Sequence, residues 1–290
     1  MTRLEHHSNI VPWQILASEI GFTIEVVEIL PDGTLDLEDY NAKLSNSPSL
    51  VCFSHVSNTL GTINNAKQLT ALAHKVGALV LIDGAQAAPH MNVDFQDINC
   101  DFYVASCHKM YGPTGIGFLY GKLALLESMP PWRGGGEMIS SVSFDEPTTF
   151  NVAPYKFEAG TPHISGAIAL AAAIKWMQSV GVENIASHEH ALTEYAHKEL
   201  LKTEGLRIYG TAERKAGVVS FLVEGVHPSD IGTLLDQLGV AVRTGHHCTE
   251  PLMDWFKIPG TVRASFAAYT TFEEIDSLVA GLERAIKMLK

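Results

Sequence analysis

The stretch Phe102-Tyr-Val-Ala-Ser-Cys-His-Lys-Met-Tyr-Gly-Pro113 decides how the rest of this chain is interpreted. Its apolar residues 102–105 predict a buried strand. Lys109 follows the end of that strand, where the glycine-rich segment 112–117 leads the chain away. Most lysines at such places are solvated loop residues, and the lysine alone would favour that interpretation. The alternative is a partly desolvated amine that reacts covalently with a carbonyl group.

A second predicted strand ends in an acid. Residues 78–82 (Ala-Leu-Val-Leu-Ile) lead directly into Asp83-Gly-Ala-Gln86. A carboxylate at the end of a buried strand costs free energy unless it is paired. The protonated pyridine nitrogen of pyridoxal phosphate is a suitable partner, because this pairing makes the ring a better electron sink. The two strand ends together favour Lys109 as the lysine that forms a Schiff base with pyridoxal phosphate.

Composition excludes several classes of protein. A chain of 290 residues is long enough for one or two domains, and its 46% apolar content indicates a globular fold. The net charge is −12 and no basic tract is present, which argues against nucleic acid or an anionic membrane as a partner. We find no signal peptide and no apolar run long enough to span a bilayer, so we expect a cytoplasmic protein.

The four cysteines are scattered without the spacing of a zinc site, and we expect no metal centre. Cys52, Cys100 and Cys107 lie in or beside apolar runs, which predicts small core residues. Cys248 instead ends the polar stretch Arg243-Thr-Gly-His-His-Cys248, where an exposed thiol raises the question of reactivity. The residues alone support a chance surface thiol and a reactive thiol equally.

Strand and helix patterns alternate through the first half of the chain and predict a mainly parallel α/β sheet. Ligands of such sheets bind at the carboxyl ends of the strands. The expected strands cover residues 22–29, 50–53, 78–83, 102–105 and 115–120, and the helices cover 9–20, 36–45 and 65–76. Polar residues that follow these strand ends are His55, Asn58, Asp83, Gln86, Ser106, His108 and Lys109.

The second half predicts a different arrangement. Residues 130–160, with Gly134-Gly-Gly136, indicate an irregular flexible loop. The later patterns predict helices over 165–180, 182–203, 229–238 and 272–289, and strands over 218–223, 240–243 and 261–266. We therefore expect a cofactor-binding large domain over 1–170 and a C-terminal small α+β domain over 171–290 that includes the linking helices.

From Glu5 to the C-terminus the sequence resembles the SufS-type (group II) cysteine desulfurases of the class V aminotransferase family, which are fold-type I pyridoxal phosphate enzymes. The resemblance is carried by Glu5-His-His-x-Asn9, by Ser106-x-His-Lys109 and by Arg243-x-Gly-His-His-Cys248, which lies on a short loop. It implies conversion of L-cysteine to L-alanine, with a persulfide on Cys248 that supplies sulfur for iron–sulfur cluster assembly. Selenocysteine lyase activity is a further implication.

The resemblance assigns roles that the residue types alone leave open. Without it, His6 would be a surface histidine, Asn58 a turn residue and Thr161 a loop residue. With it, the cofactor-binding residues are His6 on the ring, Asp83 on the pyridine nitrogen, Asn58 and Gln86 near the phenolic oxygen, Ser106 and His108 on the phosphate, Lys109, and Thr161 on the phosphate of a neighbouring subunit. His6, Lys109 and Cys248 are the implied catalytic residues.

Substrate and partner assignments follow from the same resemblance. Arg263, which alone would be a surface salt-bridge residue, is implied to clamp the substrate carboxylate, a task that suits the planar guanidinium. Arg243 is implied to be a second arginine on the substrate side. The implied partners are a SufE- or SufU-like sulfur acceptor protein and a second copy of the chain in a homodimer.

Two departures from the family pattern affect these expectations. The related proteins carry roughly a hundred more residues, about the size of a small domain, before the Glu-His-His motif. That segment includes a Gly-Thr-Thr-Glu-like loop at the phosphate, so we expect this 290-residue chain to bind pyridoxal phosphate weakly or not at all. Cys107 stands where relatives commonly have glycine. The alternative functions are another class V enzyme, or a catalytically impaired paralogue that binds partners.

Overall fold

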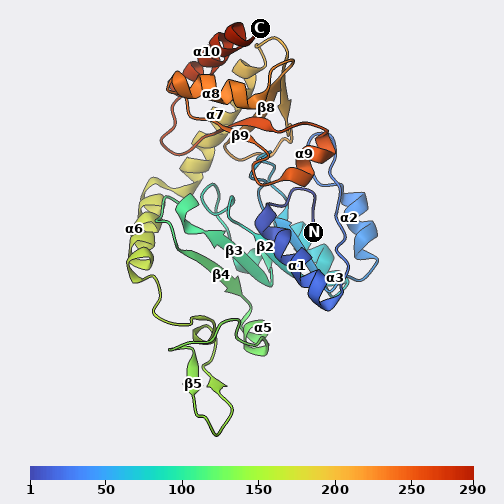
Figure 1. Ribbon diagram of the computed structural model, residues 1–290, viewed down its shortest axis with the longest axis vertical. Coiled ribbons are helices and arrows are strands. Elements are labelled where there is room, and N and C mark those ends of the chain that lie inside the picture. Colours follow the sequence, from blue (N-terminus) through green and yellow to red (C-terminus); the bar gives the residue numbers. More distant parts are fainter.

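The computed structural model describes residues 1–290, and its N-terminal part is built on a four-stranded sheet (Figure 1). The strands are β1 (Leu50–Ser54), β2 (Leu79–Asp83), β3 (Phe102–Ser106) and β4 (Gly117–Gly121), in that spatial order. The first three are parallel, whereas β4 is antiparallel to β3. The prediction of a mainly parallel α/β sheet is confirmed, and the carboxyl ends of β1, β2 and β3 meet at one edge.

Helices around this sheet begin where the sequence supplies acceptors for free backbone N–H groups. The Asp36 carboxylate accepts two N–H groups at the start of α2 (Leu37–Leu44), and Asn65 caps α3 (Ala66–Lys75). Helix α3 then buries Leu69 in the core under the sheet. The remaining helices of this part are η1 (His7–Asn9), α1 (Val11–Ile20), α4 (Phe95–Ile98) and α5 (Leu123–Ser128).

The C-terminal part contains a second sheet, which is antiparallel. Its strands, in spatial order, are β7 (Leu206–Tyr209), β8 (Val218–Val223), β10 (Thr261–Ser265) and β9 (Arg243–Gly245). Its helices are α8 (Pro228–Gln237), α9 (Glu250–Phe256) and α10 (Phe272–Leu289), and a capping box fixes the start of α10. Two long helices, α6 (Ile164–Val180) and α7 (Val182–Leu200), connect the two sheets (Figure 1).

Each sheet has its own hydrophobic core. The larger cluster contains Phe53 and Tyr103 under the first sheet, and the smaller one contains Phe221 with α7, α8 and α10. Leu252 of α9 packs into the larger cluster, although α9 follows the second sheet's strand β9 in sequence. The predicted division near residue 170 stays a prediction, because it falls within the continuous helix α6.

Several elements differ from the sequence-based expectations. Residues 22–29 form only two isolated bridges, Val27 with Thr2 and Ile29 with Leu35. The backbone of residues 25–27 bonds only to that of residues 1–3, so no continuous strand forms. Strand β9 begins at Arg243 instead of Val240. Short elements that carry no clear periodicity, namely β7, α4, α5 and α9, were not predicted.

The region over 130–160 is irregular as expected, apart from a small hairpin of β5 (Ile139–Ser141) and β6 (Thr149–Phe150) and a helical turn, η3 (Tyr155–Phe157). The hairpin lies apart from both sheets (Figure 1).

No single helix is long and apolar enough to cross a membrane. Helices α6 and α7 together have the length and composition of a membrane span, but the pair bends by 72° at its junction.

Candidate active site

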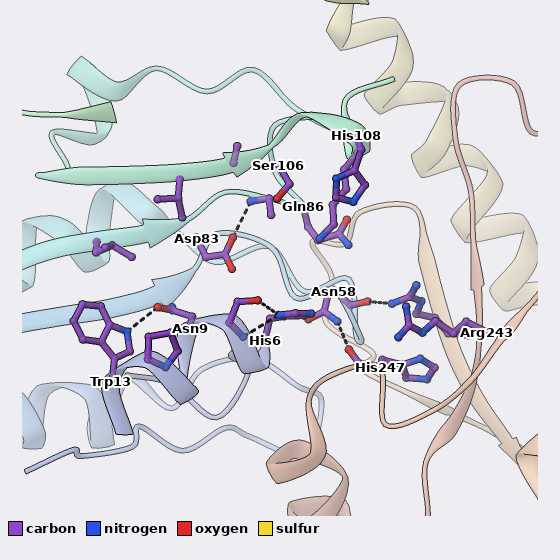
Figure 2. A pocket seen from close by; sticks show the side chains of 18 residues that line it. His6, Asn9, Trp13, Asn58, Asp83, Gln86, Ser106, His108, Arg243 and His247 are labelled. Atoms are coloured by element: carbon purple, nitrogen blue, oxygen red, sulfur yellow. Dashed lines mark hydrogen bonds between the residues drawn. The ribbon is translucent and has the colours of Figure 1, made fainter. Parts of the chain in front are cut away.

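A cavity of about 540 Å³ lies at the carboxyl edge of the first sheet and extends to the second sheet (Figure 2). It is therefore where the predicted parallel sheet should bind a ligand. The residues that line it are His6, Ser8, Asn9, Pro12, Trp13, Asn58, Leu81, Asp83, Ala85, Gln86, Val104, Ala105, Ser106, His108, Lys109, Arg243, His247 and Arg263.

Asp83, the last residue of β2, faces this cavity (Figure 2). Its Oδ1 accepts the N–H of Ala85 at 2.9 Å, and the carboxylate makes no ion pair within the chain. Only glycine fits at the next position, because a Cβ on Gly84 would lie 1.8 Å from Cε1 of the buried Tyr103. The strand end therefore presents a carboxylate without a cationic partner.

Lys109 ends a 3₁₀ turn that follows β3, and its side chain lines the same cavity. Burial lowers the pKa of Lys109, and the positive charges of Arg263 and Arg243 lower it further. The charges of Asp83 and Cys248 act in the opposite direction. A larger fraction of the amine is therefore neutral, and thus nucleophilic, than for a lysine in water.

His6 enters the cavity from the segment before α1. Its Nδ1 accepts the N–H of Ser8 at 3.1 Å, and burial lowers the pKa of His6, followed by the charge of Lys109. The segment is fixed by the fully buried Glu5, which accepts hydrogen bonds from Asn9 Nδ2 at 2.7 Å and from Ser54 Oγ at 2.8 Å. Glu5 thus anchors the Glu-His-His-x-Asn segment to β1, and Asn9 at the other end of the pattern bonds to Glu5.

Two arginines from the second sheet form the opposite wall. Arg263 on β10 donates from Nη1 to the backbone oxygen of Asn58 at 2.7 Å, whereas its buried Nε has no partner. Burial, followed by the charge of Arg243, lowers the pKa of Arg263 to about 10. His247 also has a buried nitrogen without a partner, Nδ1. A half-buried guanidinium with an unpartnered Nε, beside a second cation, is suited to bind an anionic ligand.

Cys248 lies beside the cavity, on the loop between β9 and α9. Its Sγ is 3.6 Å from Nη2 of Arg243, and its backbone oxygen accepts the N–H of His7 at 2.8 Å. His247 and Cys248 both have left-handed backbone conformations, with φ of 54° and 60°, which non-glycine residues rarely adopt. Asn58 Nδ2 supports the loop by donating to the backbone oxygen of His247 at 2.7 Å.

The structure brings most of the predicted site residues together. His6, Asn58, Asp83, Gln86, Ser106, His108, Lys109, Arg243 and Arg263 all line the cavity, and Cys248 is adjacent to it. The exception is Thr161, which is exposed on the loop before α6 and does not line the cavity of this single chain. The roles of all these residues stay predictions.

Sequence reasoning missed part of the wall. Ser8, Pro12 and Trp13 line the cavity because the segment 6–13 folds back across the strand ends, and Trp13 Nε1 donates to Asn9 Oδ1 at 3.0 Å. Their apolar or small side chains gave no chemical signal. His247 could have been found, since it lies between the predicted Arg243 and Cys248, but nothing in the sequence indicated that its ring is buried.

Comparisons with known proteins identify the family of this chain. The family description "Aminotransferase class-V" matches residues 1–278. A cysteine desulfurase of Serratia proteamaculans is 50% identical over 289 residues, which is 100% of this chain and 71% of the relative. A probable cysteine desulfurase of Halalkalibacterium halodurans is 49% identical over 284 residues, which is 98% of this chain and 70% of the relative.

The similar solved structures that follow are also cysteine desulfurases. The cysteine desulfurase CsdA of Escherichia coli is similar with a TM-score of 0.95 and 38% identity, over 100% of this chain and 72% of that one. A cysteine desulfurase of Thermococcus onnurineus NA1 has a TM-score of 0.95 and 40% identity, over 99% of this chain and 72% of that one. By its family match and by relatives that cover nearly its whole length, this chain belongs to the class V aminotransferase family.

Proposed function

We propose that this chain is a pyridoxal phosphate-dependent cysteine desulfurase that converts L-cysteine to L-alanine and carries the sulfur as a persulfide on Cys248. The observation that supports it most is the meeting of an amine, Lys109, an unpaired carboxylate, Asp83, and two arginines in one cavity, with a half-buried thiol beside them. Relatives that are 50% and 49% identical to this chain over 289 aligned residues are named cysteine desulfurases.

The donor set of the cavity fits pyridoxal phosphate. Lys109 would hold the aldehyde carbon and Asp83 the pyridine nitrogen, and Ser106 and His108 would bind the phosphate. His6 would cover the ring, with Asn58 and Gln86 near the phenolic oxygen. When bound, the cofactor supplies an electron sink for bonds at the substrate's α-carbon.

The protein's own groups then have separate tasks. Arg263, whose buried Nε has no partner, binds the substrate carboxylate. Arg243 holds the thiolate of Cys248, since its Nη2 is 3.6 Å from Sγ. The thiolate attacks the substrate sulfur, so that an S–S bond forms while the carbon–sulfur bond breaks. The electron pair of the broken bond stays with the carbon skeleton, which takes up protons to become alanine. His6 and Lys109 line the cavity and can supply these protons.

The finer assignments belong to the same proposal. The loop that carries Cys248 is short and has the Arg-x-Gly-His-His-Cys pattern, which supports the SufS-type group, a role in iron–sulfur cluster assembly and a SufE- or SufU-like acceptor protein in the cytoplasm. Selenocysteine is a second substrate of the same chemistry. The exposed position of Thr161 supports a homodimer in which this residue reaches the partner's cofactor. We also propose a large domain over 1–170 and a small domain over 171–290.

The proposal is tested with the purified 290-residue chain. The chain is titrated with pyridoxal phosphate and then given L-cysteine and a thiol reductant, and alanine and sulfide are measured. At cofactor concentrations high enough to offset weak binding, we expect both products in equal amounts from the wild type, none from Lys109→Ala, and no sulfide from Cys248→Ala. Cys52→Ala, a change at a buried thiol that does not line the cavity, is the matched control and should retain activity.

The same titration tests the expectation of weak cofactor binding. A stable yellow complex that absorbs near ~420 nm, a property of the cofactor's own chemistry, would contradict that expectation. Wild-type chain that binds the cofactor but releases no sulfide would overturn the desulfurase proposal and favour another class V activity. Chain that forms no complex at saturating cofactor would favour a partner-binding role.

A further inference from the structure

A buried glutamate outside the cavity contacts one of the segments that form it. Glu189 of α7 is 1% exposed, and its Oε2 accepts a hydrogen bond from His90 Nδ1 at 2.6 Å. His90 lies on the turn after β2 that also carries Gln86, a residue of the cavity wall. The second oxygen, Oε1, is buried and makes no hydrogen bond. A buried carboxylate oxygen of this kind calls for a donor.

Tyr111 lies two residues after Lys109 and packs on the apolar cluster that contains Ile185 of α7, one turn before Glu189. Its hydroxyl is therefore a candidate for that donor. The oxygen of Tyr111 accepts the N–H of Ala268 at 3.1 Å, so the hydroxyl proton remains free for another acceptor. Burial raises the pKa of Tyr111, and the neighbouring charge of Glu189 raises it further, which keeps the hydroxyl protonated. Ala268 follows β10, the strand that carries Arg263.

The turn that carries Lys109 needs support from outside itself. Tyr111 has a left-handed φ of 58°, which is unfavourable for an aromatic residue. The turn is also tight, because a Cβ on Gly112 would lie 2.8 Å from the backbone oxygen of Cys107. The ring of Tyr111 packs edge-on against Trp176 of α6, with 4.8 Å between ring centroids. Contacts to the Tyr111 side chain therefore determine where the turn, and with it Lys109, is held.

We propose that Glu189 is a positioning residue that holds His90 with one carboxylate oxygen and the Tyr111 hydroxyl with the other. In this way it fixes the turn that carries Gln86 to the turn that carries Lys109, and both turns to the end of β10. Glu189 does not line the cavity and touches no substrate. The inference rests on the proposed function in one respect, namely that Lys109 and Gln86 hold the cofactor.

Amide hydrogen exchange on the cofactor-free chain tests this arrangement directly. The N–H groups of Met110 and Gly112 both donate to the backbone oxygen of Cys107, so they report whether the turn is closed. In Glu189→Gln, which keeps the size of the side chain, we expect both amides to exchange about tenfold faster, because a loss of about 1.4 kcal/mol changes an equilibrium constant tenfold. Glu194→Gln, an exposed change on the same helix, should have no effect.

A second variant separates positioning from general stability. Tyr111→Phe removes only the hydroxyl, and the double variant with Glu189→Gln should exchange no faster at 110 and 112 than either single variant, since the two groups act as one pair. Unchanged exchange at 110 and 112 in Glu189→Gln overturns the proposal. It is also overturned if exchange rises throughout the chain together with a lower urea midpoint. Because neither cofactor nor substrate is present, failure of the desulfurase activity leaves this outcome unaffected.

Discussion

Cys248 should be the one thiol of the native chain that reacts quickly with iodoacetamide. The other three, Cys52, Cys100 and Cys107, are 4%, 0% and 0% exposed. Burial raises the pKa of Cys52 to about 12 and that of Cys100 to about 11, and it also raises the pKa of Cys107. At pH 8, about one in 10,000 molecules carries a Cys52 thiolate, whereas an ordinary thiol is about one-quarter ionised.

The difference in labelling should therefore exceed about 1,000-fold for Cys52 before its lack of exposure is considered. The assay is a short alkylation at pH 8, followed by digestion and mass measurement of the four cysteine-containing peptides. Only the peptide with Cys248 should gain mass, and Cys248→Ser should remove nearly all labelling of the native chain. All four peptides should be labelled when the same reaction is run in urea.

Arg243 provides a further check on this reasoning. Its Nη2 is 3.6 Å from Sγ of Cys248, so Arg243→Gln removes a positive charge that lies beside the sulfur. We expect labelling of Cys248 at pH 7 to become several-fold slower. Labelling of Cys52 or Cys107 at the rate of Cys248 would refute the argument from burial. An unreactive Cys248 would remove the nucleophile from the proposed reaction.

Three further predictions concern stability and can be read from urea unfolding curves. Gly84→Ala should lower the free energy of unfolding by about 1–3 kcal/mol, because its Cβ would overlap the ring of Tyr103, and a smaller residue at 103 should recover part of this loss. Asn58→Ala should cost about 1–2 kcal/mol, since the backbone oxygen of His247 loses its donor, and a wild-type midpoint would contradict this. Burial lowers the pKa of His55 to about 4, so the unfolded chain binds more protons as the pH falls from 7 to 5. Stability should drop by roughly 2 kcal/mol in that window from this histidine, and His55→Gln should reduce the drop.

Most of the elements that position the site follow from the sequence, because their patterns are local. The strands that end at Asp83 and just before Lys109 are short apolar runs with polar residues at their ends, and both form as predicted. The prediction of a strand over 22–29 was wrong, because a strand needs a continuous neighbouring backbone, and this segment finds only short pairings with residues 1–3 and with residues 35 and 36. Periodicity reports which face is apolar, but it does not report whether a pairing partner exists.

The candidate site was predictable where residue chemistry and chain position coincide. Lys109 and Asp83 were identified by unusual polar groups at strand ends, whereas Trp13 carries no such signal and joins the wall only through tertiary folding. The buried pairing of Glu189 with His90 was equally hidden, since it joins residues 99 positions apart. Such contacts depend on how α7 meets the turn after β2, which no local pattern contains.

The position of the thiol is a product of contacts between the two sheets. The loop after β1 reaches the second sheet through Asn58, which donates to His247, and through Thr59, whose hydroxyl lies 2.7 Å from that of Thr249. Ser220 on β8 donates to the backbone oxygen of Thr59 at 2.6 Å, which closes the connection. The left-handed residues His247 and Cys248, each costing roughly 1–2 kcal/mol, lie on the loop between β9 and α9. They keep this conformation only because these hydrogen bonds hold that loop. The strained loop therefore places Cys248 beside the cavity only when both sheets are folded and in contact, so the thiol and the lysine form a single site through tertiary structure.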